Sequence, residues 1–325
     1  VGRDALKPGY THVKKTRRSF TYDVTTLVKG AKGAKNVFAA EVSAGWWRDK
    51  IVNYAGRKSA FRGVLEIVYA DGATKRYGTS PETWKAGVAG PVTHADIFDG
   101  EEYDARIPQG YLTPEKLSTP EVNTEFQGSI VPSDGAEVYL RRDIALGSQS
   151  AYIWQDIAGA ADREYGKVVI TRTYAPGEEM TVLPGENLVI DFGQNAAAHP
   201  CLSFAGAAGV TVRIRVAEML NDGNGAKARG NDGPEGSVYR VNLRKGYENG
   251  RLVQYTFAGT GEEAYLPRFT FFGYRYVSVT ATAPVTIARL VSVPVTSIAK
   301  GLELGSLVTG DKDVNQLISN VYWGQ

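Results

Sequence analysis

The sequence predicts an all-β protein built from two antiparallel β-sandwich or jelly-roll domains. Three observations lead to this fold class: a length of 325 residues, a content of 37 glycines and 18 tyrosines, and many short segments of alternating apolar residues. A domain of about 150 residues is typical, so the length predicts two domains. Strands joined by hairpins rather than by helices cannot form parallel crossover units, which favours antiparallel sheets.

Individual strands follow from period-two alternation of apolar and polar residues. The segment 210–216 is typical of a strand with one wet face, because Val, Ile and Val alternate with Thr and Arg. Asp71-Gly72 predicts a hairpin turn between strands at 64–69 and 74–77, and Pro184-Gly185 predicts a second hairpin. Further strands are expected at 20–24, 37–42, 167–174, 188–192, 252–257, 275–282 and 285–293.

The end of the chain departs from the β pattern. In residues 311–325, apolar side chains recur at helical spacing and Asp311 is placed to cap the helix, so one amphipathic helix is expected there. The residues that form its apolar stripe are Val314, Leu317, Ile318, Val321 and Tyr322. No other helix is predicted against which this stripe could pack, and we therefore expect the helix to begin a domain that is cut short.

Segment composition gives the expected domain boundaries. Residues 1–110 form a first β-sandwich that is incomplete at its start, and residues 166–299 form a second sandwich. Residues 111–165 are a connection or insertion, since the stretch 107–134 is rich in Pro, Ser, Thr and Glu and lacks periodicity. Residues 300–325 are the start of a truncated helical domain.

Charge and composition exclude several classes of function. Lys and Arg number 37 against 35 Asp and Glu, so the net charge of +2 favours neither nucleic acid nor an anionic membrane as a partner. One cysteine and three histidines predict neither a disulfide nor a zinc site. No apolar run of about 18 residues and no signal peptide is visible. Because the chain begins at Val1 and not at Met, an export signal could have been removed from it. The sequence therefore does not decide the cellular compartment.

Adjacent tryptophans give one candidate for binding. Trp46 and Trp47 lie beside a glycine and charged residues, and an indole ring can stack on the apolar face of a sugar. Neighbouring side chains of a strand face opposite ways, so core packing of both rings is the alternative that we favour.

An acidic stretch gives a second candidate. Residues 96–106 hold five carboxylates, enough oxygen to suggest calcium or a glycosidase acid and base pair. A surface turn balanced by Arg106 is the interpretation that we favour. In the segment 191–195, Asp191 and Asn195 are expected to satisfy backbone groups of a turn at Gly193. No nucleophile motif, phosphate loop or dinucleotide fingerprint is present.

Short motifs along the chain, each weak by itself, form a recognisable order. They are LKPGYT at 6–11, YDVT at 22–25, GWW at 45–47, DIFDGE at 96–101, YDAR at 103–106, DFGQN at 191–195, EML at 218–220, FTFFGYRYV at 269–277, NQL at 315–317 and WGQ at 323–325. In this order they resemble bacterial α-L-rhamnosidases of glycoside hydrolase family 78. The resemblance covers nearly the whole chain.

The resemblance implies an N-terminal β-sandwich, a concanavalin-like β domain and then a helical toroid that cleaves the sugar. The family's catalytic acid and base lie in that toroid, so no residue of this chain inherits either role. The resemblance thus implies a parent enzyme that removes terminal α-L-rhamnose by inverting hydrolysis, with this chain as its inactive β-rich portion. The partners implied are a rhamnose-containing glycan or glycoside and, within the enzyme, the catalytic domain.

Two alternatives stay open beside this interpretation: a carbohydrate-binding module and a purely structural scaffold. Some family members bind rhamnose through calcium in the first sandwich, and the candidate carbohydrate-binding residues here are Trp46, Trp47, Asp49 and Asn53. No metal ligands are assigned and no cofactor is required, with calcium retained as an option. A glycan-degrading enzyme is expected in the periplasm or secreted, with the cytoplasm as the alternative.

Overall fold

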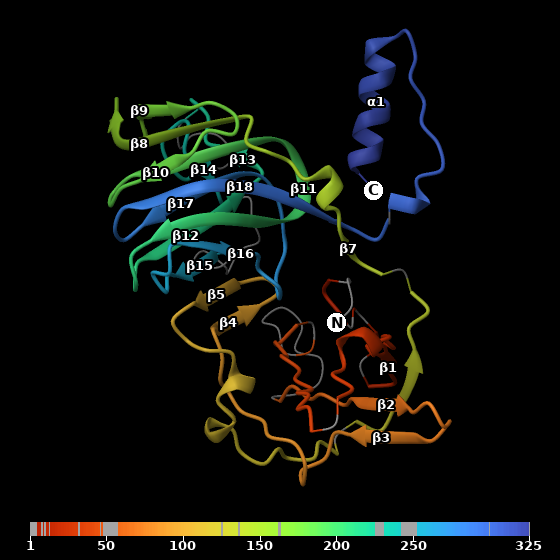
Figure 1. Ribbon diagram of the computed structural model, residues 1–325. Helices are drawn as coiled ribbons and strands as arrows, with labels where there is room; N and C mark the ends of the chain where they lie inside the picture. Colours follow the sequence, from red (N-terminus) through yellow and green to blue (C-terminus); the bar gives the residue numbers. More distant parts are fainter. Residues whose placement is uncertain are drawn as a thin grey trace. The chain divides into compact units, whose positions relative to one another are not determined.

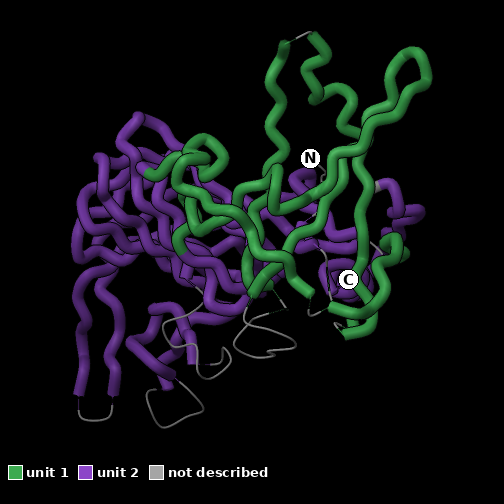
Figure 2. Tube along the Cα trace, turned by 90° about the horizontal axis from the view of Figure 1, so that it is seen from below, with its two compact units in different colours: residues 1–2, 8–93, 107–134 green, residues 3–7, 94–106, 135–325 purple. Residues whose placement is uncertain are grey.

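A computed structural model gives the structure of the chain. It describes residues 5–7, 9, 11–12, 14–31, 33–45, 47, 58–124, 126–135, 137–161, 164–224, 231–241, 252–298 and 300–324. The chain forms two compact units (Figure 2). Unit 1 comprises residues 1–2, 8–93 and 107–134, and unit 2 comprises residues 3–7, 94–106 and 135–325. The boundaries expected from the sequence stay a prediction.

Unit 1 contains short pairs of strands in its described part (Figure 1). Strands β2 (Val64–Val68) and β3 (Thr74–Gly78) form an antiparallel hairpin, which confirms the turn predicted at Asp71-Gly72. Gly72 has φ +83°, a conformation that glycine adopts without a steric penalty. Strands β1 (Thr16–Ser19) and β6 (Ser129–Pro132) pair in parallel. The 3₁₀ turns of this unit are η1 (Thr25–Leu27), η2 (Gly110–Leu112) and η3 (Pro114–Lys116).

Two strands predicted in unit 1 were wrong. Residues 20–24 lead from β1 into η1, because Asp23 Oδ1 accepts hydrogen bonds from the Thr25 amide and hydroxyl at 2.9 and 2.6 Å and turns the chain. Residues 37–42 are exposed and irregular. Phe38 packs against Phe61 and Trp84, with ring centroids 6.2 and 5.1 Å apart, so this segment is held by an aromatic contact and not by a strand partner.

Unit 2 is dominated by one extended set of paired strands whose order runs β10, β18, β11, β17, β12, β15, β5, β4 (Figure 1). The bounds along this path are β4 (Val92–Asp96), β5 (Gly100–Asp104), β10 (Met180–Val182), β11 (Asn187–Gly206), β12 (Thr211–Ala217), β15 (Leu252–Thr256), β17 (Phe272–Ala281) and β18 (Val285–Thr296). Strands off the path are β7 (Tyr139–Leu140), β8 (Ser150–Ala158), β9 (Lys167–Tyr174) and β16 (Glu262–Tyr265), and a separate pair is β13 (Met219–Leu220) with β14 (Val238–Tyr239). The all-β fold class is confirmed.

Strand β11 links the two layers of this sandwich. Its first part pairs with β8 and β17, and its second part pairs with β18 and β16. The register to β17 shifts between Asp191 and Ala196, on either side of Gly193 with φ +75°. A β-bulge of this kind bends a strand, which lets one strand serve both layers.

The hairpin predicted at Pro184-Gly185 was wrong, although the turn itself is present. The Glu186 amide donates to the Leu183 carbonyl at 3.1 Å and Gly185 has φ +84°. The preceding strand β10 pairs with β18, whereas the following residues of β11 pair with β8 and β17. The turn carries the chain from one layer to the other, so the strands on its two sides have different partners.

The core of unit 2 follows from the alternation seen in the sequence. Val212, Ile214 and Val216 on β12 are at most 1% exposed, whereas Arg213 between them is exposed. An aromatic cluster adds to this core: Phe204 lies 4.6 Å from Phe257 and 4.7 Å from Tyr255 between ring centroids. Burying one such side chain contributes about 1.5–3 kcal/mol.

One strand pair of unit 2 is parallel and depends on a glycine. Strands β5 and β15 run in the same direction, with Gly100 opposite Leu252. Gly100 has φ +115°, and a Cβ atom there would lie 2.0 Å from the Leu252 carbonyl oxygen. Only glycine fits this close approach, so the residue allows β4 and β5 to extend the sheet.

The predicted C-terminal helix is confirmed as α1 (Lys312–Trp323). Asp311 caps it, since its Oδ1 accepts from the amides of Asp313 and Val314 at 2.8 and 3.3 Å. None of the α1 residues is buried, and Leu317 and Val321 on its apolar stripe are 61% and 57% exposed. Within the described residues, no helix has the length and apolar character needed to cross a membrane.

Candidate functional site

Three motifs that lie far apart in the sequence meet at the bend of β11. The bend holds Asp191 and Asn195 of the DFGQN motif, β17 supplies Arg275, and Glu218 follows β12. Gly193 permits the bend, and its amide donates to Asp191 Oδ1 at 2.7 Å, which confirms the turn role expected for Asp191. We call these four residues, Asp191, Asn195, Glu218 and Arg275, the bend cluster.

An ion pair forms the centre of the bend cluster. Arg275 Nε and Nη2 donate to the two carboxylate oxygens of Asp191, both at 2.7 Å. This bidentate geometry is stronger than a single contact. The hydrogen bond that Arg275 donates to Asp191 raises the pKa of Arg275, and the guanidinium also lies 5.0 Å from the Tyr276 ring centroid. The pair therefore joins the bend of β11 to β17.

A second polar contact completes the cluster. Asn195 Nδ2 donates to Glu218 Oε1 at 3.2 Å, and both residues are exposed. Asn195 was expected to satisfy the turn at Gly193, yet its amide instead contacts the chain after β12. The carboxylates of the bend cluster are thus engaged by an arginine and an amide, an arrangement that fixes the bend of β11.

The acidic stretch 96–106 is placed differently from the surface turn that the sequence suggested. Asp96 and Glu101 are 5% and 0% exposed, so that interpretation was wrong for these two residues. It holds for Asp104, which forms an ion pair with Arg106 at 2.7 Å. Asp96 Oδ1 accepts from the amides of Phe98 and Asp99, at 2.8 and 3.0 Å.

Glu101 is the most completely enclosed of these carboxylates. It accepts hydrogen bonds from the Tyr265 hydroxyl at 2.6 Å and from the amides of Arg268 and Phe269 at 2.9 and 2.8 Å. Burial raises the pKa of Glu101, an effect that these donors oppose. Glu101 therefore ties β5 to the segment after β16 and is not accessible to a substrate.

Sequence reasoning missed a third buried carboxylate, Glu263. Burial alone raises the pKa of Glu263, but donors from Tyr255 and from the amides of residues 258–260 outweigh this effect and lower it. The Tyr255 hydroxyl lies 2.7 Å from Glu263 Oε2. The sequence shows only two adjacent glutamates at the start of a strand. It does not reveal that Glu263 accepts hydrogen bonds, because the amides of residues 258–260 reach it only once the loop has folded.

Of the predicted carbohydrate-binding residues, the structure describes Trp47. The Arg17 guanidinium carbon lies 4.2 Å from the Trp47 ring centroid and 4.4 Å from that of Phe126. Trp47 Nε1 donates to the Lys58 carbonyl at 2.8 Å. Trp46, Asp49 and Asn53 lie outside the described residues. The carbohydrate site therefore stays a prediction.

The described residues contain no group of three or more His, Cys, Asp or Glu side chains that could hold a metal ion. His199 and Cys201 lie on β11, and burial lowers the pKa of His199 to about 4. That imidazole is 1% exposed and is kept neutral near pH 7. The calcium option is untested and stays a prediction.

Comparison with known proteins identifies the two β regions. The family model described as the alpha-L-rhamnosidase N-terminal domain matches residues 1–136, and that of the bacterial alpha-L-rhamnosidase concanavalin-like domain matches residues 181–297. An alpha-L-rhamnosidase of Streptomyces avermitilis is 34% identical over 331 residues, covering all of this chain and 28% of that protein. One of Formosa agariphila is 27% identical over 333 residues, covering all of this chain and 31% of that protein.

Solved structures agree with these matches. The crystal structure of the Streptomyces avermitilis alpha-L-rhamnosidase complexed with L-rhamnose superimposes with a TM-score of 0.71 at 28% identity, over all of this chain and 28% of that one. The alpha-L-rhamnosidase of Dictyoglomus thermophilum, at 18% identity, shares the fold with a TM-score of 0.67 over all of this chain and 31% of that one.

Most of the chain is therefore made up of two β domains of the alpha-L-rhamnosidase type, an N-terminal domain and a concanavalin-like domain. The chain belongs to the bacterial α-L-rhamnosidase family, which confirms the resemblance carried by its motifs. It spans 28–31% of the length of the two curated relatives named above.

Proposed function

We propose that this chain is the non-catalytic β-domain portion of an enzyme that removes terminal α-L-rhamnose from glycans or glycosides by inverting hydrolysis. The observation that carries the proposal is the succession of two rhamnosidase domain models along the chain, at 1–136 and 181–297. The relatives are several times longer than this chain, which leaves room in such enzymes for a separate catalytic region. We also propose that the enzyme works in the periplasm or outside the cell.

The carboxylates of the acidic stretch support an inactive role for this portion. Inverting hydrolysis needs two carboxyl groups about 6.5–9.5 Å apart with a water between them. Asp96 and Glu101 are buried and accept hydrogen bonds from the protein. Asp191 is bound by Arg275 on both oxygens. These groups hold the fold and are poorly suited to protonate or activate anything from solvent.

The C-terminal segment supports a role as a scaffold for the catalytic region. Helix α1 exposes Val314, Leu317 and Val321 by 40%, 61% and 57%. Leu304 and Val308 before it are 93% and 84% exposed. Contiguous exposed apolar residues mark a surface that another structure covers. We propose that the catalytic helical region of the enzyme packs on this surface.

Hydrolysis of a chromogenic α-L-rhamnoside tests the proposal. The 325-residue chain should release no product, whereas the longer protein that contains it should release rhamnose with inversion, followed by NMR of the anomeric proton. Activity of the isolated chain would contradict the non-catalytic role. A longer protein that cleaves another α-glycoside and not a rhamnoside would contradict the substrate.

We retain a second candidate, rhamnose binding in unit 1, because Trp47 is partly exposed and the Arg17 guanidinium stacks on its ring. The binding residues proposed are Trp46, Trp47, Asp49 and Asn53. Isothermal titration with rhamnose, with calcium and then with a chelator, tests both the site and its metal. Trp47→Ala should abolish the heat of binding, and Trp84→Ala, which removes an indole elsewhere in unit 1, is the control.

A further inference from the structure

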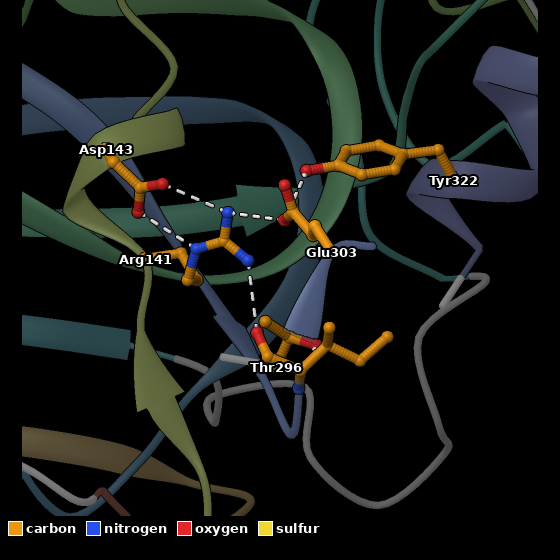
Figure 3. Close-up of polar contacts among 6 residues, drawn as sticks. Arg141, Asp143, Thr296, Glu303 and Tyr322 are labelled. Carbon is orange, nitrogen blue, oxygen red and sulfur yellow. Dashed lines mark hydrogen bonds and ion pairs between the residues drawn. The ribbon is translucent and has the colours of Figure 1, made fainter. Parts of the chain in front are cut away.

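A buried arginine links the sandwich of unit 2 to the segment that follows it (Figure 3). Arg141 lies between β7 and the 3₁₀ turn η4 (Arg142–Ile144), and its backbone amide donates to the Pro294 carbonyl of β18 at 2.8 Å. It is 5% exposed. The backbone of Arg141 is therefore fixed to the edge of the sandwich.

The Arg141 side chain is engaged in three directions. Nε and Nη2 donate to the two oxygens of Asp143 at 2.9 and 3.0 Å, and Nη1 donates to the Ile298 carbonyl at 3.0 Å. Nη2 also donates to Glu303 Oε1 at 2.6 Å. The hydrogen bonds to Asp143 and Glu303 raise the pKa of Arg141, which stays charged.

Glu303 connects Arg141 to helix α1. The Tyr322 hydroxyl in the last turn of α1 donates to Glu303 Oε1 at 3.0 Å, the same oxygen that accepts from Arg141. Figure 3 shows the continuous series from Asp143 through Arg141 and Glu303 to Tyr322. We call these four residues the polar clasp.

Helix α1 has little apolar packing of its own, so its orientation depends on the polar clasp. None of the α1 residues is buried, so apolar packing does not fix the helix to the sandwich. A helix of 12 residues is marginal in water without tertiary contacts. The clasp reaches the helix near its C-terminal end, whereas Asp311 and Asn315 order its start through local hydrogen bonds.

We infer that Arg141 is a positioning residue, which through Glu303 and Tyr322 holds α1 in one orientation on the sandwich while its apolar stripe stays open for the catalytic region. The value of this orientation to the enzyme rests on the proposed function, but the clasp itself is a property of this chain. The role suits an arginine, because its planar guanidinium makes four contacts to Asp143, Ile298 and Glu303 from three separate nitrogen atoms, whereas the donors of a lysine all share one nitrogen atom.

Hydrogen exchange of the 325-residue chain, resolved by mass spectrometry, tests the inference. Arg141→Gln, Glu303→Gln and Tyr322→Phe should each speed exchange of the amides of residues 312–323, by about tenfold for the first two and about threefold for the third. Amides of β11 should keep their protection in Glu303→Gln and Tyr322→Phe, since both changes lie outside the sandwich. Arg141→Lys should restore only part of the protection of α1.

Arg106→Gln is the matched control, because Arg106 also forms a bidentate pair, with Asp104 at 2.9 and 2.7 Å, and has no part in the clasp. It should leave α1 unchanged. Unchanged exchange of α1 in both Glu303→Gln and Arg141→Gln would overturn the inference. Equal loss of protection in α1 and β11 would overturn it as well, since it would show a general effect on the fold. The outcome does not depend on hydrolysis, so it is separate from the fate of the proposed function.

Discussion

The sandwich of unit 2 and helix α1 are held in opposite ways. In the sandwich, Phe204, Leu188 and Ile214 are at most 1% exposed and pack in a continuous core. In α1, no residue is buried, and the helix contacts the sandwich through a tyrosine hydroxyl, a carboxylate and a guanidinium. Burial of apolar area stabilises the fold but does not depend on orientation, whereas hydrogen bonds depend on orientation but add little net free energy. We therefore expect the core to set the stability of the sandwich and the hydrogen bonds to set the orientation of α1.

Truncation of a core side chain in the sandwich should cause the largest loss of stability. Phe204→Ala removes a ring packed 4.6 Å from Phe257 and 4.7 Å from Tyr255, and should lower the free energy of unfolding by about 3–5 kcal/mol. Leu317→Ala on α1, as the matched apolar truncation, should change it by less than about 0.5 kcal/mol. Chemical denaturation measures both, and equal losses would remove the contrast.

Loss of a buried acceptor should come next in size. Glu101→Ala leaves the Tyr265 hydroxyl and the amides of Arg268 and Phe269 without their acceptor, which should cost about 2–3 kcal/mol in the free energy of unfolding. The neighbouring change Glu102→Ala, on the other face of β5, should cost less than about 1 kcal/mol. If the two variants unfold at the same denaturant concentration, Glu101 does not tie β5 to the sandwich.

A smaller effect is expected at the bend of β11. Asp191→Asn keeps the shape of the side chain but loses the charge that Arg275 contacts at two points, and should lower the free energy of unfolding by about 1 kcal/mol. Asp104→Asn, which weakens the more exposed pair with Arg106, serves as the reference and should change it by less than about 0.5 kcal/mol. Thermal unfolding by circular dichroism ranks the two.

The smallest expected effect is a pH-dependent change in the environment of α1. The hydrogen bond from Arg141, and then that from Tyr322, lower the pKa of Glu303 below its usual value of 4.5. A carboxyl group with a lowered pKa stabilises the folded arrangement above its ordinary pKa, and this contribution is lost as the pH falls through the lowered value. The indole NMR signal of Trp323 should therefore shift on acidification below about pH 4.5.

The same titration has a direct control. In Glu303→Gln the group that titrates is gone, so the Trp323 signal should not respond to pH in this window. A response of the same size in the variant would assign the shift to another carboxylate.

Much of unit 2 and of the helix was predictable from the sequence, because local patterns decide them. The alternation at 210–216 gave β12, and the helical spacing after Asp311 gave α1 with its cap. The hairpin at Asp71-Gly72 is likewise a local feature. Residues 37–42 show where such reasoning fails: their composition is typical of a strand, but strand formation requires a partner that the sequence does not reveal.

The site was harder to predict than the fold. The motifs that meet in the bend cluster were visible one by one, yet Asp191 and Arg275 are 84 residues apart and only the β11 to β17 pairing brings them together. The clasp was missed for the same reason, since Arg141 and Glu303 are 162 residues apart. The complete burial of Glu101 also depends on Tyr265 of β16, which lies 164 residues further along the chain.

Native-state hydrogen exchange at increasing denaturant tests the central contrast most directly. We expect amides of β11 to exchange through an opening whose free energy falls steeply with denaturant, as in global unfolding, whereas amides of α1 should exchange through a local opening that hardly depends on denaturant. If α1 and β11 open with the same free energy and the same denaturant dependence, the helix belongs to the cooperative core and the account is wrong.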